Sequence, residues 1–211
     1  MHRHVSGDSN IAIGSHTMEY STANSENIAI GQEALGDVNQ GEGANVAIGF
    51  YAMRNVDEGT GGGDADYNIA IGYDALKGGD FGSNDRQLQR NVAIGAFALD
   101  GTGAIASTGN IAIGKDAIGG TFAAESTYNI AIGEQALDAN LNDCNYNVVV
   151  GRRAATMLVT GDANVVIGTD ALYSSTDVDK AVIIGADAAQ GVITDNADGI
   201  IAIGFSALNA N

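Results

Sequence analysis

The chain has 211 residues, enough for one hydrophobic core and at most two domains, and its hydrophobic content of 45% argues against disorder. Acidic residues outnumber basic ones by 26 to 9, which gives a formal net charge of −17. This balance argues against nucleic acid and anionic membrane surfaces as partners, because phosphate groups attract Lys and Arg.

The acidic residues are mainly aspartates, with 19 Asp against 7 Glu, and the chain contains only 3 Lys. A surface of this kind stays soluble when salt screens its charges, as in proteins of halophilic archaea and their viruses. An ordinary acidic extracellular protein would have the same composition. Both interpretations stay open at this point.

Cys144 is the only cysteine, so a disulfide within one chain is impossible. No apolar run approaches the roughly 20 residues that span a bilayer. The opening residues, MHRHVSGDSN, contain no apolar segment of the kind that a secretory signal requires. We therefore expect a chain that neither inserts into a membrane nor exports itself by that route.

One nine-residue phrase, of the form Asn-Ile-Ala-Ile-Gly-x-x-Ala-Leu, recurs along the whole sequence. Its glycine occurs eleven times at intervals of 17 to 23 residues, and the variation in length falls after the phrase. A constant unit joined by connections of variable length is typical of a solenoid. The phrase glycines are Gly14, Gly31, Gly49, Gly72, Gly95, Gly114, Gly133, Gly151, Gly168, Gly185 and Gly204.

The three residues before each phrase glycine are expected to form a short strand, because they are mostly β-branched and too few for a helix. The outer two, always Ile or Val, point to one face of the strand, and the central one points to the other. Both faces are apolar, so we expect both to be buried. In chain order these strands are residues 11–13, 28–30, 46–48, 69–71, 92–94, 111–113, 130–132, 148–150, 165–167, 182–184 and 201–203.

The other positions of the phrase predict how each coil closes. The glycine is expected to sit in a turn with positive φ. The x-x-Ala-Leu segment is expected to return as a second short strand with one face in water. Nine phrases begin with Asn, from Asn10 to Asn164, and stacked Asn side chains are expected to form a ladder along the solenoid.

Stacking each strand on its copy in the next coil, about 4.8 Å away, gives a rod of roughly 50 Å. A coil of two strands leaves the Ile/Val side of each strand uncovered, and three chains around a threefold axis would cover it. The residues assigned to trimer and core packing are Ile13, Ile30, Ile48, Ile71, Ile94, Ile113, Ile132, Val150, Ile167, Ile184 and Ile203.

The repeated phrase resembles the head repeats of YadA-like trimeric autotransporter adhesins, and equally the repeats in tail-fibre and spike proteins of tailed viruses. The resemblance extends from Asn10 to Leu208. It implies an all-β fold, a left-handed parallel β-roll of about eleven coils, assembled as a homotrimer with the Ile-rich strand inward. The expected organisation is an N-terminal extension over residues 1–9 and a single β-roll domain over residues 10–211.

Metal and catalytic chemistry find little support in the sequence. A His-x-His pair, His2 and His4, together with His16, is a weak candidate for a metal site, and a loose N-terminus explains it better. Asp64 and Asp66 lie in a Gly- and Asp-rich stretch and are weak candidates for calcium. No catalytic triad or nucleotide-binding loop is present. We predict a non-enzymatic protein without a cofactor.

Aromatic side chains are the best candidates for binding a ligand. Tyr67, Tyr128 and Tyr146 each precede the Asn of a phrase, where an exposed row of rings can lie against sugar rings. Packing between neighbouring coils is the competing explanation. Further aromatic residues occupy the two variable positions after the glycine, namely Phe50, Tyr51, Tyr73, Phe97 and Phe205.

The expected function is that of a virion structural protein of a tailed virus, in the form of a trimeric tail fibre, spike or capsid decoration. Its expected partners are itself, other virion proteins and a host-surface glycan or receptor, without nucleic acid or membrane insertion. The long connections 57–67 and 77–90 are expected to carry distinctive surface. The alternative is the head domain of a cellular trimeric adhesin at the cell surface. The viral protein is preferred because this chain has longer and more variable coils than the adhesins and shows no signal peptide, coiled-coil stalk or membrane anchor.

Overall fold

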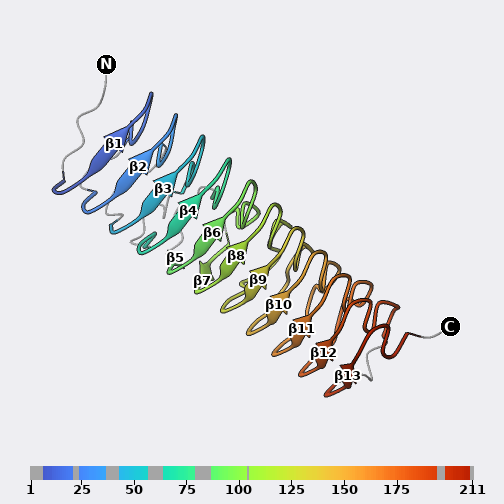
Figure 1. Ribbon diagram of the computed structural model, residues 1–211. Helices are drawn as coiled ribbons and strands as arrows, with labels where there is room; N and C mark the ends of the chain where they lie inside the picture. The colour runs from blue at the N-terminus through green and yellow to red at the C-terminus, as the bar shows by residue number, and fades with distance from the viewer. Residues whose placement is uncertain are drawn as a thin grey trace.

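A computed structural model describes residues 7–20, 24–36, 43–56, 64–78, 87–103, 105–193 and 198–209. The chain is a parallel β-solenoid in which eleven three-residue strands form one sheet. Figure 1 shows these strands one behind another along a rod, with the two termini at opposite ends. The strands are β1 (Ile11–Ile13), β2 (Ile28–Ile30), β3 (Val46–Ile48), β4 (Ile69–Ile71), β6 (Val92–Ile94), β8 (Ile111–Ile113), β9 (Ile130–Ile132), β10 (Val148–Val150), β11 (Val165–Ile167), β12 (Val182–Ile184) and β13 (Ile201–Ile203).

The predicted strands are confirmed residue for residue, and so is the all-β solenoid. Neighbouring strands pair in parallel and in register, so that each residue of the phrase faces its own counterpart, as Ala112 faces Ala131. We call each repeat a rung; it comprises the strand, the few residues before the strand and the turn after it. A second sheet of two strands, β5 (Leu88–Gln89) and β7 (Ser107–Thr108), pairs the connections before two phrases.

The return segment after the glycine is a turn, and the prediction of a second strand there was wrong. In all eleven rungs the second and fourth residues after the glycine have φ between 49° and 63°, as at Asp116 and Ile118. Left-handed residues at alternate positions exclude the extended backbone of a strand. The turns nevertheless hydrogen-bond between rungs, since Ile118 N–H donates to the Ala136 carbonyl at 3.0 Å.

Pairing between rungs begins two residues before the predicted start of the roll at Asn10. Asp8 N–H donates to Ser25 Oγ at 3.1 Å, and Glu26 N–H donates to the Asp8 carbonyl at 2.9 Å. The first rung therefore includes part of the expected N-terminal extension. Much of the two long connections, residues 57–63 and 79–86, lies outside the described residues, as do His2 and His4. No helix in the described part of the chain is long and apolar enough to cross a membrane.

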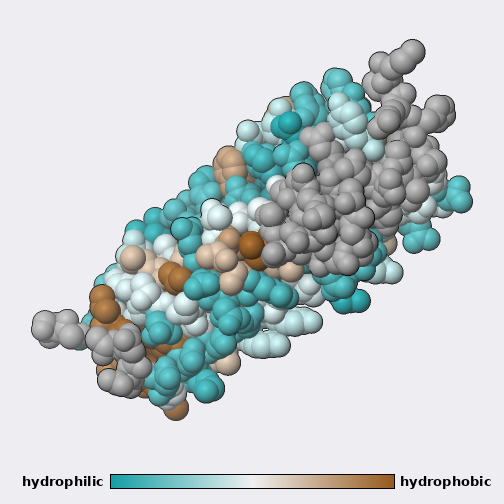
Figure 2. Space-filling view, turned by 180° about the vertical axis from the view of Figure 1, so that it is seen from behind, coloured by the Kyte–Doolittle hydropathy of each residue, from teal (hydrophilic) through white to brown (hydrophobic). Residues whose placement is uncertain are grey.

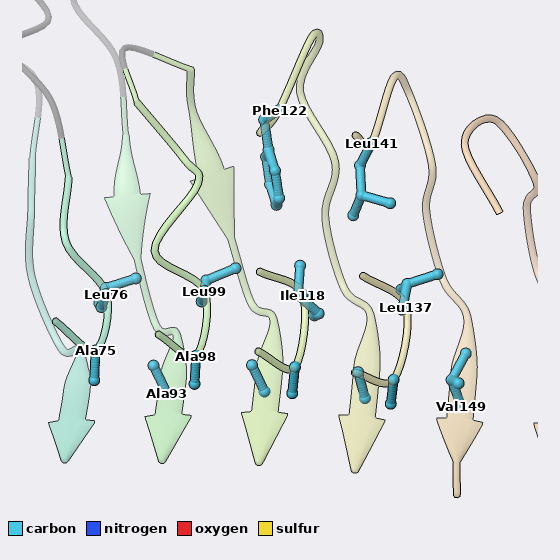
Figure 3. Packing of buried hydrophobic residues seen from close by; sticks show 14 of the residues in the cluster. Ala75, Leu76, Ala93, Ala98, Leu99, Ile118, Phe122, Leu137, Leu141 and Val149 are labelled. Carbon is cyan, nitrogen blue, oxygen red and sulfur yellow. The ribbon is translucent and has the colours of Figure 1, made fainter. Parts of the chain in front are cut away.

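The interior of the solenoid is narrow and is filled by columns of small and medium side chains. The central strand residue and the Ala and Leu of the return turn are buried in successive rungs, and Figure 3 shows Ala93, Ala98 and Leu99 together there. Phe122 and Leu141, from the connections that follow the turns, are buried as well, and Figure 3 shows them beyond Ile118 and Leu137. Such a core needs Ala where the walls approach closely and Leu where they separate.

The asparagines form the predicted ladder inside the solenoid. Asn110 Oδ1 accepts the backbone N–H of Asn129 at 2.9 Å, and Asn129 Oδ1 accepts that of Asn147 at 3.0 Å. From Asn45 to Asn164 each Nδ2 also donates to a carbonyl of the next rung, as Asn129 does to Cys144 at 2.8 Å. The ladder ends where Asn164 Oδ1 accepts the N–H of Ala181, whose side chain cannot continue it.

The phrase glycines have φ between 130° and 143° and stack on one another, so the predicted positive φ is confirmed. A Cβ on Gly114 would lie 2.5 Å from the carbonyl oxygen of Gly133, a distance that real Cβ atoms do not adopt. Gly204 ends the column, and its nearest contact would be the Ala207 Cβ at 4.0 Å. Stacking therefore requires glycine at every rung that has a successor.

We expect Gly114→Ala to lower the free energy of unfolding by about 3 kcal/mol or more, because strained φ and a clash with backbone act together. Gly204→Ala is the matched control, since it shares the φ but lacks the clash, and should cost about 1–2 kcal/mol. Denaturant unfolding of both variants measures the difference. Equal losses would show that φ alone demands glycine.

Asn129→Ala should cost about 2–4 kcal/mol, because it leaves the buried N–H of Asn147 and the buried carbonyl of Cys144 without partners. Asn10→Ala removes the equivalent group at the end of the ladder, where Asn10 is partly exposed and water replaces the lost bonds. Its cost should be clearly smaller in the same unfolding experiment. A similar small cost at both positions would contradict a stabilising ladder.

Candidate interaction surfaces

The outer side of the long sheet is an uninterrupted apolar strip, which we call the Ile/Val face. It consists of the first and third residues of the eleven strands, and none of these side chains is buried, whereas the central residues are buried from Ala29 onward. Ile94, in the middle of the rod, is 36% exposed, and Ile203, in the last strand, is 64% exposed. The predicted trimer residues therefore lie outside the core of the single chain, on a face that the described residues leave at least partly exposed.

Figure 2, seen from behind the view of Figure 1, shows a mainly hydrophilic surface among the coloured residues, with hydrophobic residues gathered toward the end that carries the C-terminus. At that end Val192, Phe205 and Leu208 are exposed.

The three candidate tyrosines divide into a pair and a single residue. Tyr128 and Tyr146 stack in neighbouring rungs with ring centroids 5.4 Å apart and an interplanar angle of 5°. Tyr67 occupies the same position of its rung, but Arg90 and Gly109 separate it from the pair along that column. All three are exposed, at 51%, 61% and 59% for Tyr128, Tyr146 and Tyr67.

A second aromatic cluster lies at the other end of the strands, just after the phrase glycines. Phe50 stacks on Tyr73 with centroids 5.5 Å apart, and Tyr73 meets Phe97 edge-on at 5.1 Å. Arg54 lies over the Tyr51 ring at 4.4 Å and pairs with Glu33 at 3.2 Å. These contacts support packing between rungs for this cluster, whereas Phe205 lies apart from it at the C-terminal end.

A shallow cleft of about 230 Å³ opens near the first rungs, lined by His16, Glu19, Tyr20, Glu33 and Arg54. His16 Nδ1 lies 2.6 Å from Glu19 Oε2, and Arg54 is already engaged by Glu33. The described lining residues include no nucleophilic Ser, Thr or Cys beside the imidazole. The geometry therefore gives no acid–base and nucleophile pair from which a reaction can be derived.

The weak calcium candidates, Asp64 and Asp66, already accept hydrogen bonds from neighbouring rungs. Asp66 Oδ1 accepts the Gly43 N–H at 2.6 Å, and Asp64 Oδ2 accepts Gln89 Nε2 at 3.0 Å. Burial raises the pKa of Asp66, against the lowering effect of the Gly43 hydrogen bond. Within the described ranges no three His, Cys, Asp or Glu side chains converge to hold a metal ion.

A second ladder, which the sequence reasoning missed, runs two residues before the asparagines. Asn145 Oδ1 accepts the Thr127 N–H at 2.8 Å, Asp162 Oδ1 accepts the Asn145 N–H at 2.6 Å, and Asp179 Oδ1 accepts the Asp162 N–H at 2.7 Å. The recurrence of Asp, Asn and Thr at this position was its signal in the sequence. Burial is the main cause that raises the pKa of Asp162. The carboxylate of Asp179 raises it too, because stacking brings the two like charges together.

Cys144 is buried in the interior, where burial and the carboxylates around it raise the pKa of its thiol to about 12. Its Sγ lies 3.1 Å from the Gly161 carbonyl and 3.2 Å from Asn147 Nδ2. A thiol held in this form is a poor nucleophile at neutral pH. It serves as a small core side chain beside the Asn ladder.

The chain matches no family model, no curated protein and no solved structure. The surfaces must therefore be interpreted through their own chemistry. Two of the described surfaces present apolar or aromatic groups to solvent, namely the Ile/Val face and the tyrosine pair.

Stability should rise on mild acidification because of two carboxylates on the return turns. The pKa of both Asp100 and Asp138 is raised from 3.8 to about 6, mainly by burial and in part by the nearby carboxylate of Asp116. Asp74 acts on Asp100 in the same direction, whereas Lys77 and Lys115 oppose the shifts. A pKa raised in the folded state means that the fold prefers the neutral acid, so stability increases as the pH falls through 6 toward 4.

Asp138→Asn should therefore raise the melting temperature above pH 7, and the advantage should shrink below pH 6, where the native carboxyl is itself protonated. Asp177→Asn, at an exposed position, is the control for simple loss of charge. Thermal unfolding between pH 4.5 and 8 measures both variants. A constant difference across this range would show that Asp138 does not titrate as the burial implies.

Proposed function

We propose that this protein is a non-enzymatic structural protein of a tailed virus, which assembles as a homotrimer and projects from the virion as a tail fibre, spike or capsid decoration. The observation that carries the proposal is the Ile/Val face. It extends over eleven rungs, or about 50 Å by about 10 Å, giving about 500 Å² of apolar surface on each chain. An apolar patch of that size is as large as the largest patch on a typical soluble monomer, and such patches often mark interaction sites.

Threefold symmetry covers this face economically. The face is straight, apolar and continuous, and three chains that point it toward a common axis would bury it along its whole length. The acidic residues then remain outside, where three copies of −17 give a formal charge of −51. That charge keeps rods apart and soluble, and it fits a saline environment in which salt screens the repulsion.

The mechanical properties of the rod also support a projecting role. Each rung contacts only its neighbours, so stiffness and stability accumulate with the number of rungs rather than through a globular core. In-register parallel pairing resists bending between rungs, as a spacer that holds a surface away from a particle requires. The same rod would serve as the head of a cellular trimeric adhesin. Antibody labelling of purified virions distinguishes the two, because only the viral protein decorates the particle.

Ile94→Asp should prevent trimer formation, because three carboxylates would meet near an apolar axis. Thr176→Asp, which adds the same charge at an exposed position of a connection between rungs, should leave the trimer intact. Light scattering coupled to size exclusion gives the mass of each variant, and circular dichroism shows whether the coil remains folded. A wild-type chain that stays monomeric in dilute solution would overturn the trimer.

A further inference from the structure

The tyrosine pair leaves one aromatic face open to solvent. A Cβ on Gly109 would lie 2.6 Å from Tyr128 Cδ1, so the Tyr128 ring covers Gly109. Tyr146 stacks parallel on Tyr128, which places the order Gly109, Tyr128, Tyr146, Ala163 along one column. Ala163 is exposed and carries only a methyl group, so the far face of Tyr146 is bare.

The backbone around this face is held rigidly. Tyr146 N–H donates to the Thr127 carbonyl at 3.1 Å, and Ala163 N–H donates to the Asn145 carbonyl at 2.9 Å. The Asn ladder follows the tyrosine column, and the ladder of Asn145 and Asp162 precedes it. A preorganised aromatic face loses little entropy when a ligand settles on it.

The charges beside the open face limit what it can bind. Asp162 lies close enough to Asp143 and Asp179 for both carboxylates to raise its pKa. Three carboxylates this close together repel an anionic ligand. Lys180 follows Ala163 in the tyrosine column, two rungs or roughly 10 Å beyond Tyr146, and its ammonium group can donate hydrogen bonds there. A ligand without negative charge that has one apolar flat face and hydroxyl groups matches the ring, the carboxylate acceptors and the ammonium donor.

We propose that the Tyr146 face binds a neutral pyranose sugar, whose C–H face lies on the ring while its hydroxyls reach the carboxylate of Asp162 and the side chain of Lys180. The inference rests on the proposed role at a virion surface, to which it adds the class of ligand. Tyr67 lacks the stacked partner and the open alanine. It therefore serves as the natural comparison on the same rod.

Saturation-transfer NMR of the full-length protein with methyl galactoside, methyl glucoside and N-acetylglucosamine tests the proposal. Wild-type protein should transfer saturation to at least one of these sugars, and Tyr146→Ala should bind it roughly tenfold more weakly. Tyr67→Ala should bind like wild type.

Ala163→Tyr is the decisive variant, because Tyr128 and Tyr146 already occupy this backbone position at φ values of 57° and 59°, close to the 56° of Ala163. It should extend the stack, keep or raise the melting temperature, and abolish sugar binding by covering the face. Unchanged binding by a folded Ala163→Tyr protein would overturn the proposal. So would binding of sialic acid, a sulfated sugar or choline in place of the neutral sugars.

The outcome is separable from the proposed function. A virion-borne trimer that adsorbs to its host equally well with Tyr146→Ala, and that binds no neutral sugar, refutes the sugar site and leaves the structural role standing. A monomeric protein absent from virions that still loses sugar binding with Ala163→Tyr refutes the structural role and leaves the site standing.

Discussion

Parallel pairing in register is the constraint on which the rest of this structure depends. Each strand pairs with its counterpart in the next rung. Every residue of the phrase therefore lies about 4.8 Å from the residue at the same position of the next rung, which is usually of the same type. A residue type is tolerated only if it can stack on itself. Glycine can stack where a Cβ would clash with the carbonyl of the next phrase glycine. Asn can stack because its side chain accepts a hydrogen bond from one backbone N–H and donates one to a backbone carbonyl.

The same constraint shapes the surface. Apolar side chains stacked in register become the continuous Ile/Val face, and aromatic side chains become the tyrosine pair and the cluster around Tyr73. Carboxylates stacked in register repel one another, and this repulsion between Asp162 and Asp179 adds to burial in raising the pKa of Asp162. A solenoid therefore repeats the residue type of one position as an extended strip along the rod. Where a different residue interrupts a strip, as Ala163 does after Tyr146, the surface has a local feature that a ligand can distinguish.

Much of the fold could be predicted from the sequence because stacking imposes the same chemistry on every rung. The strands, the positive φ of the glycines and the Asn ladder followed from column identities alone. The return segment could not be predicted correctly, because Ala-Leu is compatible with a strand and only the left-handed residues two positions apart, such as Asp116 and Ile118, exclude it. Propensity carries no information about a conformation that the tertiary contacts impose.

The candidate surfaces were only partly predictable, for a similar reason. Stacking of Tyr128 on Tyr146 followed from their adjacent rungs, but the bare far face of Tyr146 depends on which way the rings lean, which sequence columns do not encode. The carboxylates of Asp64 and Asp66 looked suited to calcium until their hydrogen bonds to Gly43 and Gln89 were seen. The Ile/Val face, in contrast, was evident from sequence, because a thin coil cannot cover both sides of its own strand.

Distances between chains test most directly whether three Ile/Val faces meet on one axis. Nitroxide labels on Ile113→Cys, in the middle of the face, and on Thr176→Cys, in an exposed connection, can be compared by continuous-wave and pulsed electron paramagnetic resonance. The native Cys144 is buried, with its thiol pKa raised to about 12, and should resist labelling. The account predicts three-spin coupling at short distance for Ile113 and at longer distance for Thr176. Absence of coupling at Ile113, or a shorter distance at Thr176 than at Ile113, would contradict it.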